Sequence, residues 1–250
     1  QNLGSQKLSI ILIPGWSMPA EIWRYQLEGL GQYYHVVALD PRGQGESDAP
    51  LCGYTAERRA MDLHELIKPF AAVLLVGWSL GAIEALQTVH MFGDSRIAGL
   101  VLVDSSVGEE PEPSSSEAFR RRLRENRQKT LYEFVGAIFR MPQPQAELER
   151  LVQSAQRMTV EQSLALLSYP FERTHWRRIV HGFKGPLLYL VTSQYEAQAR
   201  NLQRNRPGTW CEFFRDAGHA LFVDEAARFN RRIAEFAKGL PLPPIQESPS

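Results

Sequence analysis

Six short, mainly apolar runs of residues are spread along this chain, and they constrain its fold more than any other feature. Runs of this kind, without polar alternation, are typical of strands buried on both faces, as in a parallel sheet. Segments of helical character separate several of the runs, which favours right-handed strand–helix–strand crossovers. We therefore predict an α/β fold, a mostly parallel sheet flanked by helices. The predicted strands are LSIILI (8–13), YHVVAL (34–39), AVLLVG (72–77), AGLVLV (98–103), PLLYLV (186–191) and TWCEFF (209–214), and the predicted helices are 19–30, 54–70, 81–92 and 224–240.

One long segment interrupts this alternation. Between Val103 and Pro186 the chain shows helical patterns but no convincing strand. A connection of that length inside a compact domain needs structure of its own. We predict an inserted helical cap at 105–181, above the carboxyl ends of the strands, where open α/β sheets bind ligands. The core would then comprise 1–104 and 182–240, and 241–250 is expected to be a flexible tail.

Composition and charge exclude several classes of function. The formal net charge is zero, with 28 basic and 28 acidic side chains, so no global field favours nucleic acid or an anionic membrane. No apolar run approaches the ~20 residues of a membrane-spanning helix. Cys52 and Cys211 are too few for a disulfide framework or a zinc cage, so we expect reduced thiols and no metal site. We expect a cytoplasmic protein, but the first residue is Gln, which leaves an already removed signal peptide open.

The pentapeptide GWSLG (77–81) joins a predicted strand to a predicted helix. One interpretation is a simple Gly/Ser turn. The other is the nucleophile elbow, in which G-x-S-x-G between strand and helix projects a serine from a sharp turn, and the glycines permit close backbone approach. The start of the following helix would favour negative charge that develops at the serine. We predict that Ser79 is a catalytic nucleophile.

A serine hydroxyl at neutral pH needs a base that takes its proton. The chain has six histidines, and five of them fall in predicted helices, in the cap or at the start of a strand. His219 lies instead between the last predicted strand and the last predicted helix. In the chain order Ser, acid, His, that loop carries the base. We therefore predict that His219 is the general base.

Four motifs in this order make the chain resemble the α/β-hydrolase superfamily over nearly its whole length outside the cap. They are IPGWS (13–17), LDPRGQGESD (39–48), GWSLG (77–81) and AGHALF (217–222). The resemblance implies the α/β-hydrolase fold with an inserted helical cap, and no cofactor. Within the superfamily the chain is similar to small carboxylesterases, among them the pimeloyl-carrier-protein methyl ester esterases, and to non-haem chloroperoxidase-like esterases.

The third member of a triad, an acid, is ambiguous in this sequence. The family usually places it in the loop after PLLYLV, but here that loop reads TSQYEAQAR, and no aspartate occurs between Asp104 and Asp216. Glu196 lies in the loop but is expected to begin a helix. Asp104 ends an apolar strand at the predicted catalytic edge, where a buried carboxylate needs a partner. We favour Asp104 and keep Glu196 as the alternative acid.

An oxyanion hole needs two backbone N–H groups directed at the tetrahedral intermediate. By resemblance these belong to Leu80, which follows the elbow serine, and to Trp16 in the PGWS turn. The family's usual histidine before that glycine is Pro14 here. Asp40, in LDPRGQGESD, is expected to brace its own turn rather than to act in catalysis.

The predicted cap offers two further features. An arginine cluster (Arg120, Arg121, Arg122, Arg124 and Arg127) suggests a dock for an acidic carrier protein, although the cap as a whole is nearly neutral and a solvated helix face is the better interpretation. Apolar residues at helical spacing (Leu131, Phe134, Val135 and Ile138) are first of all packing residues, and they can also roof an acyl pocket.

Together these features predict a monomeric or weakly associating serine hydrolase of small carboxylic esters. Alternative reactions for the same residues are hydrolysis of thioesters or carrier-protein esters, carbon–carbon bond hydrolysis and peracid formation. A different class of function, a ligand-binding or signalling homologue without turnover, is favoured by the lack of an aspartate in the usual loop.

Overall fold

The structure is a computed structural model that describes residues 8–93, 95–168 and 170–242. Its six strands form one sheet in the order β2-β1-β3-β4-β5-β6, and every neighbouring pair is parallel. Each strand overlaps one of the apolar runs, so the predicted sheet is confirmed. The strands are β1 (Ser9–Ile13), β2 (His35–Ala38), β3 (Val73–Trp78), β4 (Ile97–Val103), β5 (Leu187–Val191) and β6 (Trp210–Phe213).

Burial along the sheet explains why the sequence shows continuous apolar runs. Every residue of β1, β3 and β5 is buried, because helices cover both faces of the central strands. The edge strands β2 and β6 are only partly buried, and accordingly they carry His35 and Glu212. The apolar side chains of the sheet therefore lie at the centre of the core.

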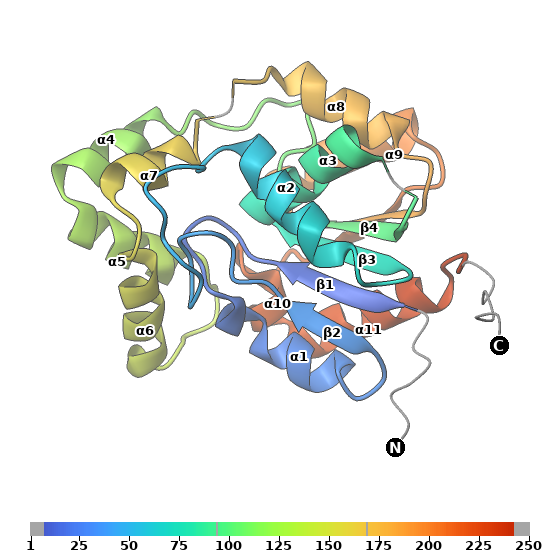
Figure 1. Cartoon of the computed structure of the whole chain (residues 1–250), viewed down its shortest axis with the longest axis horizontal. Helices are drawn as coiled ribbons and strands as arrows, with labels where there is room; N and C mark the ends of the chain where they lie inside the picture. The colour runs from blue at the N-terminus through green and yellow to red at the C-terminus, as the bar shows by residue number, and fades with distance from the viewer. Residues whose placement is uncertain (1–7, 94, 169, 243–250) are drawn as a thin grey trace.

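Helices lie on both faces of the sheet (Figure 1). On one face, α3 packs against both α2 and α8, and on the other α1 packs against α11. The core helices are α1 (Arg24–Leu30), α2 (Ala56–Ile67), α3 (Leu80–Phe92), α8 (Arg173–Gly182), α9 (Glu196–Asn205), α10 (Leu221–Asp224) and α11 (Ala226–Lys238), with short 3-10 turns η1 (Ala20–Trp23) and η2 (Ser193–Tyr195).

The last helix begins later than predicted. The sequence favoured a helix over 224–240, but α11 begins at Ala226, and Asp224 ends the separate short helix α10. The break falls at Glu225, whose backbone is not helical (φ −122°, ψ 46°). Asp224 is thereby free to make non-local hydrogen bonds, which are described below.

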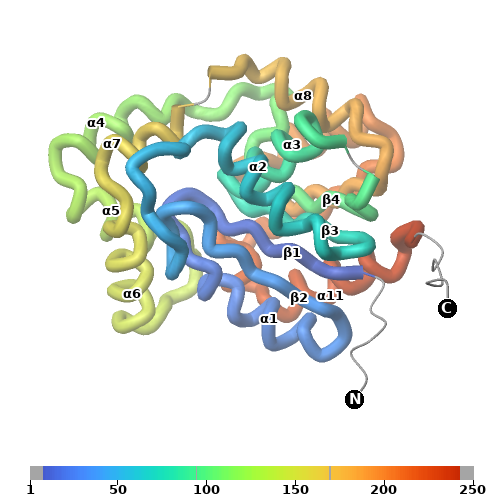
Figure 2. Tube along the Cα trace, in the orientation of Figure 1, coloured from blue at the N-terminus to red at the C-terminus, as the bar shows by residue number. Residues whose placement is uncertain are grey.

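Within the part of the chain that the structure describes, five helices lie between β4 and β5, as expected for an inserted helical segment. Four of them, α4 (Glu117–Glu125), α5 (Arg127–Ala137), α6 (Gln145–Ala155) and α7 (Val160–Ala165), gather beyond one end of the sheet (Figure 1), and the trace in Figure 2 shows them as one green-to-yellow group. We call these four helices, the connections between them and residues 166–168 after α7 the cap. The fifth helix, α8, packs on α3. The borders proposed for core and cap, 1–104, 105–181 and 182–240, stay a prediction, and residues 243–250 of the expected tail lie outside the described residues.

The strand order places a switch point beside β1. The chain passes from β1 outwards to β2 and then returns to the other side of β1 as β3. Connections that leave the sheet in opposite directions open a crevice at the carboxyl ends of the strands, where ligands bind in such sheets. The predicted site residues of β1, β3 and β4 all follow these carboxyl ends.

Candidate active site

Ser79 occupies a strained turn between β3 and α3. It is the N-cap of α3 and has φ 54° and ψ −116°, a conformation that costs an ordinary residue free energy and is typical of functional sites. The turn requires close backbone approach, because a Cβ on Gly81 would lie 2.4 Å from the carbonyl oxygen of Ile13. The local geometry is therefore that of the sharp strand-to-helix turn which the sequence predicted, with Ser79 partly exposed at its tip.

Asp104 occupies the corresponding position on the neighbouring strand. Trp78 and Val103 are paired in the β3–β4 register, so Ser79 and Asp104 are the next residues on the two strands. The N–H of Ser79 donates to the carbonyl of Val103 at 2.9 Å. Asp104 also has positive φ, 43°. Two strained residues thus lie side by side at the carboxyl edge of the sheet.

The carboxylate of Asp104 is fully buried and is held by hydrogen bonds. Its Oδ1 accepts from the backbone N–H of Thr192 at 2.7 Å and from the Thr192 hydroxyl at 2.8 Å. Its Oδ2 lies 2.8 Å from Nδ1 of His219. Burial, together with the nearby Asp104 charge, raises the pKa of Tyr195 to about 12, which keeps that phenol neutral. Thr192 and His219 thus give the Asp104 carboxylate the hydrogen-bond partners that a buried carboxylate requires.

His219 is fixed by its main chain as well as by its ring. The indole N–H of Trp78, the residue before Ser79, donates to the carbonyl of His219 at 2.9 Å. The side chain of His219 remains about one-fifth exposed (21%), whereas that of Asp104 is 0% exposed. Because the contact with Asp104 uses Nδ1, Nε2 is the ring nitrogen that can exchange a proton with another group.

Glu196, the alternative acid, is engaged elsewhere. It begins α9, as expected, and its carboxylate accepts from Arg200 at 2.6 Å and from Arg215 at 2.8 Å. Hydrogen bonds to Arg215 and Arg200 lower the pKa of Glu196 to about 2. The structure therefore brings Asp104, and not Glu196, to His219.

The two predicted oxyanion donors come from different segments: Leu80 directly follows Ser79 in the chain, and Trp16 follows Gly15, which lies beside Ser79 in space. Leu80 is the first residue of α3, and Trp16 follows the carboxyl end of β1. Among the described residues, neither N–H donates to a backbone carbonyl, so neither donor is committed to the main chain. The indole of Trp16 points into the cap, where its N–H donates to the carbonyl of Ser163 at 2.7 Å.

An aromatic cluster joins this turn to the cap. The ring of Trp16 meets Phe119 and Phe134 edge-on, with centroids 5.4 and 5.2 Å apart. Phe119 lies in α4 and Phe134 in α5, so two cap helices contact the residue that carries a candidate oxyanion donor. Phe134, one of the residues expected to roof an acyl pocket, thus packs with Phe119 against the ring of Trp16.

The cap also holds the loop that carries His219. The carboxylate of Asp224 accepts from the N–H of Gly218 at 2.7 Å and, on the cap side, from the N–H groups of Arg140 and Met141 at 2.8 and 3.0 Å. The N–H of Ala220 donates to the carbonyl of Ile138 at 2.7 Å. A Cβ on Gly218 would lie 2.7 Å from that same carbonyl oxygen, so only glycine allows the approach. We call these contacts between 138–141 and 218–224 the cap clamp.

Sequence reasoning missed three groups of this site. Thr192 directly follows the predicted strand 186–191, as Asp104 follows the predicted strand 98–103. This position indicated that the Thr192 hydroxyl lies at the same edge of the sheet as Asp104. Trp78 and Asp224 gave no comparable signal, because their hydrogen bonds join segments far apart in the chain. Asp40 behaves as expected: its carboxylate accepts from the N–H of Glu46 at 2.9 Å and so braces its own turn.

Within residues 8–93, 95–168 and 170–242, no group of three or more His, Cys, Asp or Glu side chains is arranged to hold a metal ion. In the same ranges, no helix combines the length and apolar character needed to cross a membrane.

Known proteins resemble this chain in sequence and in structure. The sequence model of the group described as "Alpha/beta hydrolase family" matches residues 10–232. A pimeloyl-(acyl-carrier protein) methyl ester esterase of Cronobacter sakazakii is 25% identical over 262 residues, 92% of each chain, and one of Sodalis glossinidius is 32% identical over 148 residues, 54% of each chain. The solved structure of the esterase EaEST from Exiguobacterium antarcticum superposes with a TM-score of 0.82 at 22% identity, covering 93% of this chain and 92% of that one. The last similarity shows that the fold is the α/β-hydrolase fold.

Proposed function

This chain belongs to the alpha/beta hydrolase family, and from that premise we propose that it cleaves carboxylic esters, with Ser79 as nucleophile, His219 as general base and Asp104 as the acid that orients the base. One observation carries the proposal. Asp104, on the strand end next to that of Ser79, is fully buried and lies 2.8 Å from Nδ1 of His219. A buried carboxylate on one imidazole nitrogen selects the tautomer whose other nitrogen can accept a proton.

The first half-reaction forms an acyl-enzyme. Oγ of Ser79 attacks the ester carbonyl carbon while Nε2 of His219 takes its proton. The tetrahedral intermediate collapses, the imidazolium returns the proton to the leaving alkoxide, and the alcohol departs. In the second half-reaction water attacks the acyl-enzyme, His219 takes the water's proton and returns it to Oγ, and the carboxylic acid is released.

Negative charge on the carbonyl oxygen is stabilised by the N–H groups of Trp16 and Leu80. Donors that are already oriented lose little free energy in reorganisation when the oxyanion forms, and one such donor typically contributes ~10²–10³ in kcat. Leu80 also begins α3, whose N-terminal dipole adds to this stabilisation. The contribution of Asp104 is to hold the imidazolium that forms during each half-reaction.

The absence of an aspartate after β5 favoured a homologue without turnover. The contact between Asp104 and His219 weakens that alternative, because it supplies the imidazole with a carboxylate from another strand. At the usual position Thr192 instead donates twice to the same carboxylate. We therefore favour an enzyme over a ligand-binding protein.

The substrate that we propose is a small ester, with its acyl group under the aromatic residues of the cap. An acidic carrier protein is less well supported, because the arginine cluster is largely occupied within the cap. Arg120 donates to the carbonyl of Leu167, Arg127 to that of Met158, and Arg122 pairs with Glu133 at 3.3 Å. Arginines held in this way contribute less to a docking surface than free ones.

The test is hydrolysis of p-nitrophenyl acetate by wild type and by Ser79→Ala, with Ser168→Ala as control for loss of a hydroxyl in the cap. Loss of a triad nucleophile typically lowers kcat by about a million-fold. A fluorophosphonate should phosphonylate Oγ of Ser79 with loss of fluoride, and so add the mass of its phosphonyl group to the wild type and to Ser168→Ala but not to Ser79→Ala. Near-normal turnover or labelling of a folded Ser79→Ala would refute the assignment.

A further inference from the structure

A buried glutamine, outside the residues assigned above, holds the turn that carries Trp16. Gln44 is 0% exposed. Its side-chain amide nitrogen donates to the carbonyl of Gly15 at 3.0 Å and to that of Met18 at 2.7 Å. Both hydrogens of the amide are thus used to fix the two ends of the turn 15–18.

The geometry of the peptide bond turns this contact into an orientation of the Trp16 N–H. The carbonyl of Gly15 and the N–H of Trp16 belong to the same planar peptide, and in a trans peptide they point in opposite directions. A hydrogen bond that fixes the carbonyl therefore also fixes where the N–H points. Donation to the carbonyl also polarises the peptide and strengthens its N–H as a donor.

This peptide passes directly beside the nucleophile. A Cβ placed on Gly15 would lie 3.2 Å from Cβ of Ser79. Ser17, two residues after Gly15, has φ 60°. The turn is therefore strained and needs support from other residues to keep its shape. Gln44 supplies such support from the side of the peptide opposite to its N–H.

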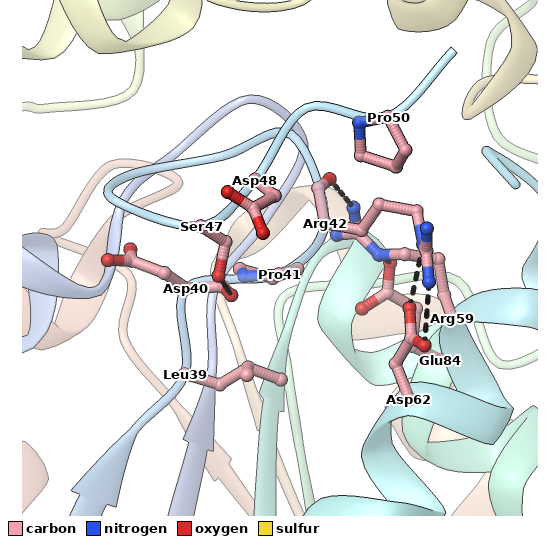
Figure 3. A pocket seen from close by; sticks show the side chains of 10 residues that line it. All are labelled: Leu39, Asp40, Pro41, Arg42, Ser47, Asp48, Pro50, Arg59, Asp62 and Glu84. Carbon is pink, nitrogen blue, oxygen red and sulfur yellow. Dashed lines mark hydrogen bonds and ion pairs between the residues drawn. The ribbon is translucent and has the colours of Figure 1, made fainter. Parts of the chain in front are cut away.

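Gln44 is held in turn by a buried ion pair. The Oε1 of Gln44 accepts from Nη2 of Arg59 at 3.0 Å. Nε of Arg59 lies 2.8 Å from Oε1 of Glu84, and the side chains of Arg59 and Glu84 are 1% and 2% exposed. In Figure 3 the Arg59 side chain lies beside Glu84, and Arg59 also donates to the carbonyl of Arg42 at 2.8 Å. Glu84 belongs to α3, the helix that begins directly after Ser79.

A buried ion pair is costly to desolvate, so it contributes little to stability, and its role here is to connect the elements that carry it. Here it links three parts of the site. Glu84 on α3, Arg59 on α2 and Gln44 form one buried chain that ends on the carbonyl of Gly15. The distance between the nucleophile helix and the Trp16 turn is thereby set by side chains that water does not reach.

We propose that Gln44 is a positioning residue of the oxyanion hole, which aims the Trp16 N–H by holding the Gly15 carbonyl and is itself held by Arg59. This role rests on the proposed function, because it concerns a tetrahedral oxyanion formed at Ser79. It predicts that disturbing Gln44 harms the transition state more than the ground state.

Gln44→Glu is the sharpest perturbation. The side chain keeps its shape and its contact with Arg59, but an acceptor replaces the donor that faced the carbonyls of Gly15 and Met18. We expect kcat for p-nitrophenyl acetate to fall by about 10- to 100-fold, less than for outright loss of an oxyanion donor, with KM changed less than about threefold. Gln44→Met, which removes the donor without adding charge, is measured alongside and should change in the same direction.

The affinity for an alkyl trifluoromethyl ketone distinguishes a positioning role of Gln44 from a merely structural one. The ketone adds reversibly to an active-site serine and forms a tetrahedral oxyanion, so its affinity should fall by the same factor as kcat/KM. Gln198→Glu is the matched control. Gln198 is 2% exposed, and its amide likewise donates to a backbone carbonyl, that of Pro111 at 2.8 Å, rather than to the Trp16 turn or to 218–224.

The control should lose thermal stability as the Gln44 variants do, yet keep kcat/KM and ketone affinity within about threefold of wild type. The proposal is overturned if the Gln44 variants fold and keep wild-type kcat/KM. It is also overturned if they lose rate without losing ketone affinity, or if Gln198→Glu loses as much of both. A wild type without Ser79-dependent turnover would instead overturn the proposed function, on which this role depends.

Discussion

Replacement of Asp104 by Asn is the most informative perturbation of this site, because the surrounding hydrogen bonds dictate how the new amide must lie. Oδ1 accepts from both the N–H and the hydroxyl of Thr192. An amide NH₂ in that place would face the backbone N–H of Thr192, so the Asn oxygen must take it. The NH₂ group then occupies the position of Oδ2, 2.8 Å from Nδ1 of His219.

A donor at that position forces Nδ1 of His219 to accept, and the ring proton moves to Nε2. In that tautomer Nε2 cannot take the proton of Ser79. The equivalent change in a serine protease costs about 10⁴ in kcat, which corresponds to about 5 kcal/mol of transition-state stabilisation. We expect a loss of this order for Asp104→Asn with the fold retained, since the amide still fills the site and still accepts from Thr192.

The assay is kcat/KM for p-nitrophenyl acetate together with thermal unfolding of each variant. Glu196→Gln is the matched control, because Glu196 pairs with Arg200 and Arg215 at the surface rather than with His219. It should lose less than about tenfold. A folded Asp104→Asn that keeps more than a tenth of wild-type activity, or a Glu196→Gln that loses more than Asp104→Asn, would refute the reasoning.

Three further perturbations probe the cap and the surface. Phe134→Ala opens the ring cluster around Trp16, so the p-nitrophenyl ester with the highest kcat/KM should have a longer acyl chain than for wild type. One methylene in such a pocket discriminates by ~1–3 kcal/mol. An unchanged dependence on acyl length would mean that Phe134 serves only to pack the cap. Glu196 has its pKa lowered from 4.5 to about 2, so its charge stabilises the folded state above about pH 4.5 and this contribution is lost as the pH falls towards 2. In urea unfolding, the free-energy difference between wild type and Glu196→Gln should therefore shrink in acid and in high salt. Asp224→Asn weakens the cap clamp and should lower kcat by about 10- to 100-fold through displacement of His219, and an unchanged kcat would separate the clamp from catalysis.

Most of the sheet could be predicted from sequence because its signal is local. A run such as AVLLVG (72–77) records burial on both faces, and β3 lies at Val73–Trp78. The Ser79 turn could be predicted for the same reason, since its glycines and its flanking strand and helix are contiguous in the chain. The boundaries of the elements could be predicted less well from sequence. Asp224 resembles the first residue of the last helix, but its carboxylate accepts from N–H groups of the cap instead.

The parts of the site that depend on tertiary contacts could be predicted only in outline. Strand order places Asp104 beside Ser79, and a choice between Asp104 and Glu196 was possible from the position of each in its element. The partners that hold the site in place, Gln44 for the Trp16 turn and Thr192 for Asp104, act across 29 and 88 residues of chain. No periodicity or local motif encodes the contact of Gln44, and for Thr192 the sequence could place the hydroxyl at the edge of the sheet but could not identify its partner.

The cap clamp sets a rule for building chimeras of this protein. Residues 138–141 belong to the insertion and 218–224 to the core, yet the Asp224 carboxylate and the pairing of Ala220 with Ile138 make them one structural unit. A foreign cap spliced only at the ends of the insertion would present an unmatched main chain to Gly218 and leave the His219 loop without its support. A chimera meant to change acyl preference should therefore take the segments equivalent to 138–141 and to 218–224 from the same donor protein, so that the new cap contacts the histidine loop that it evolved with.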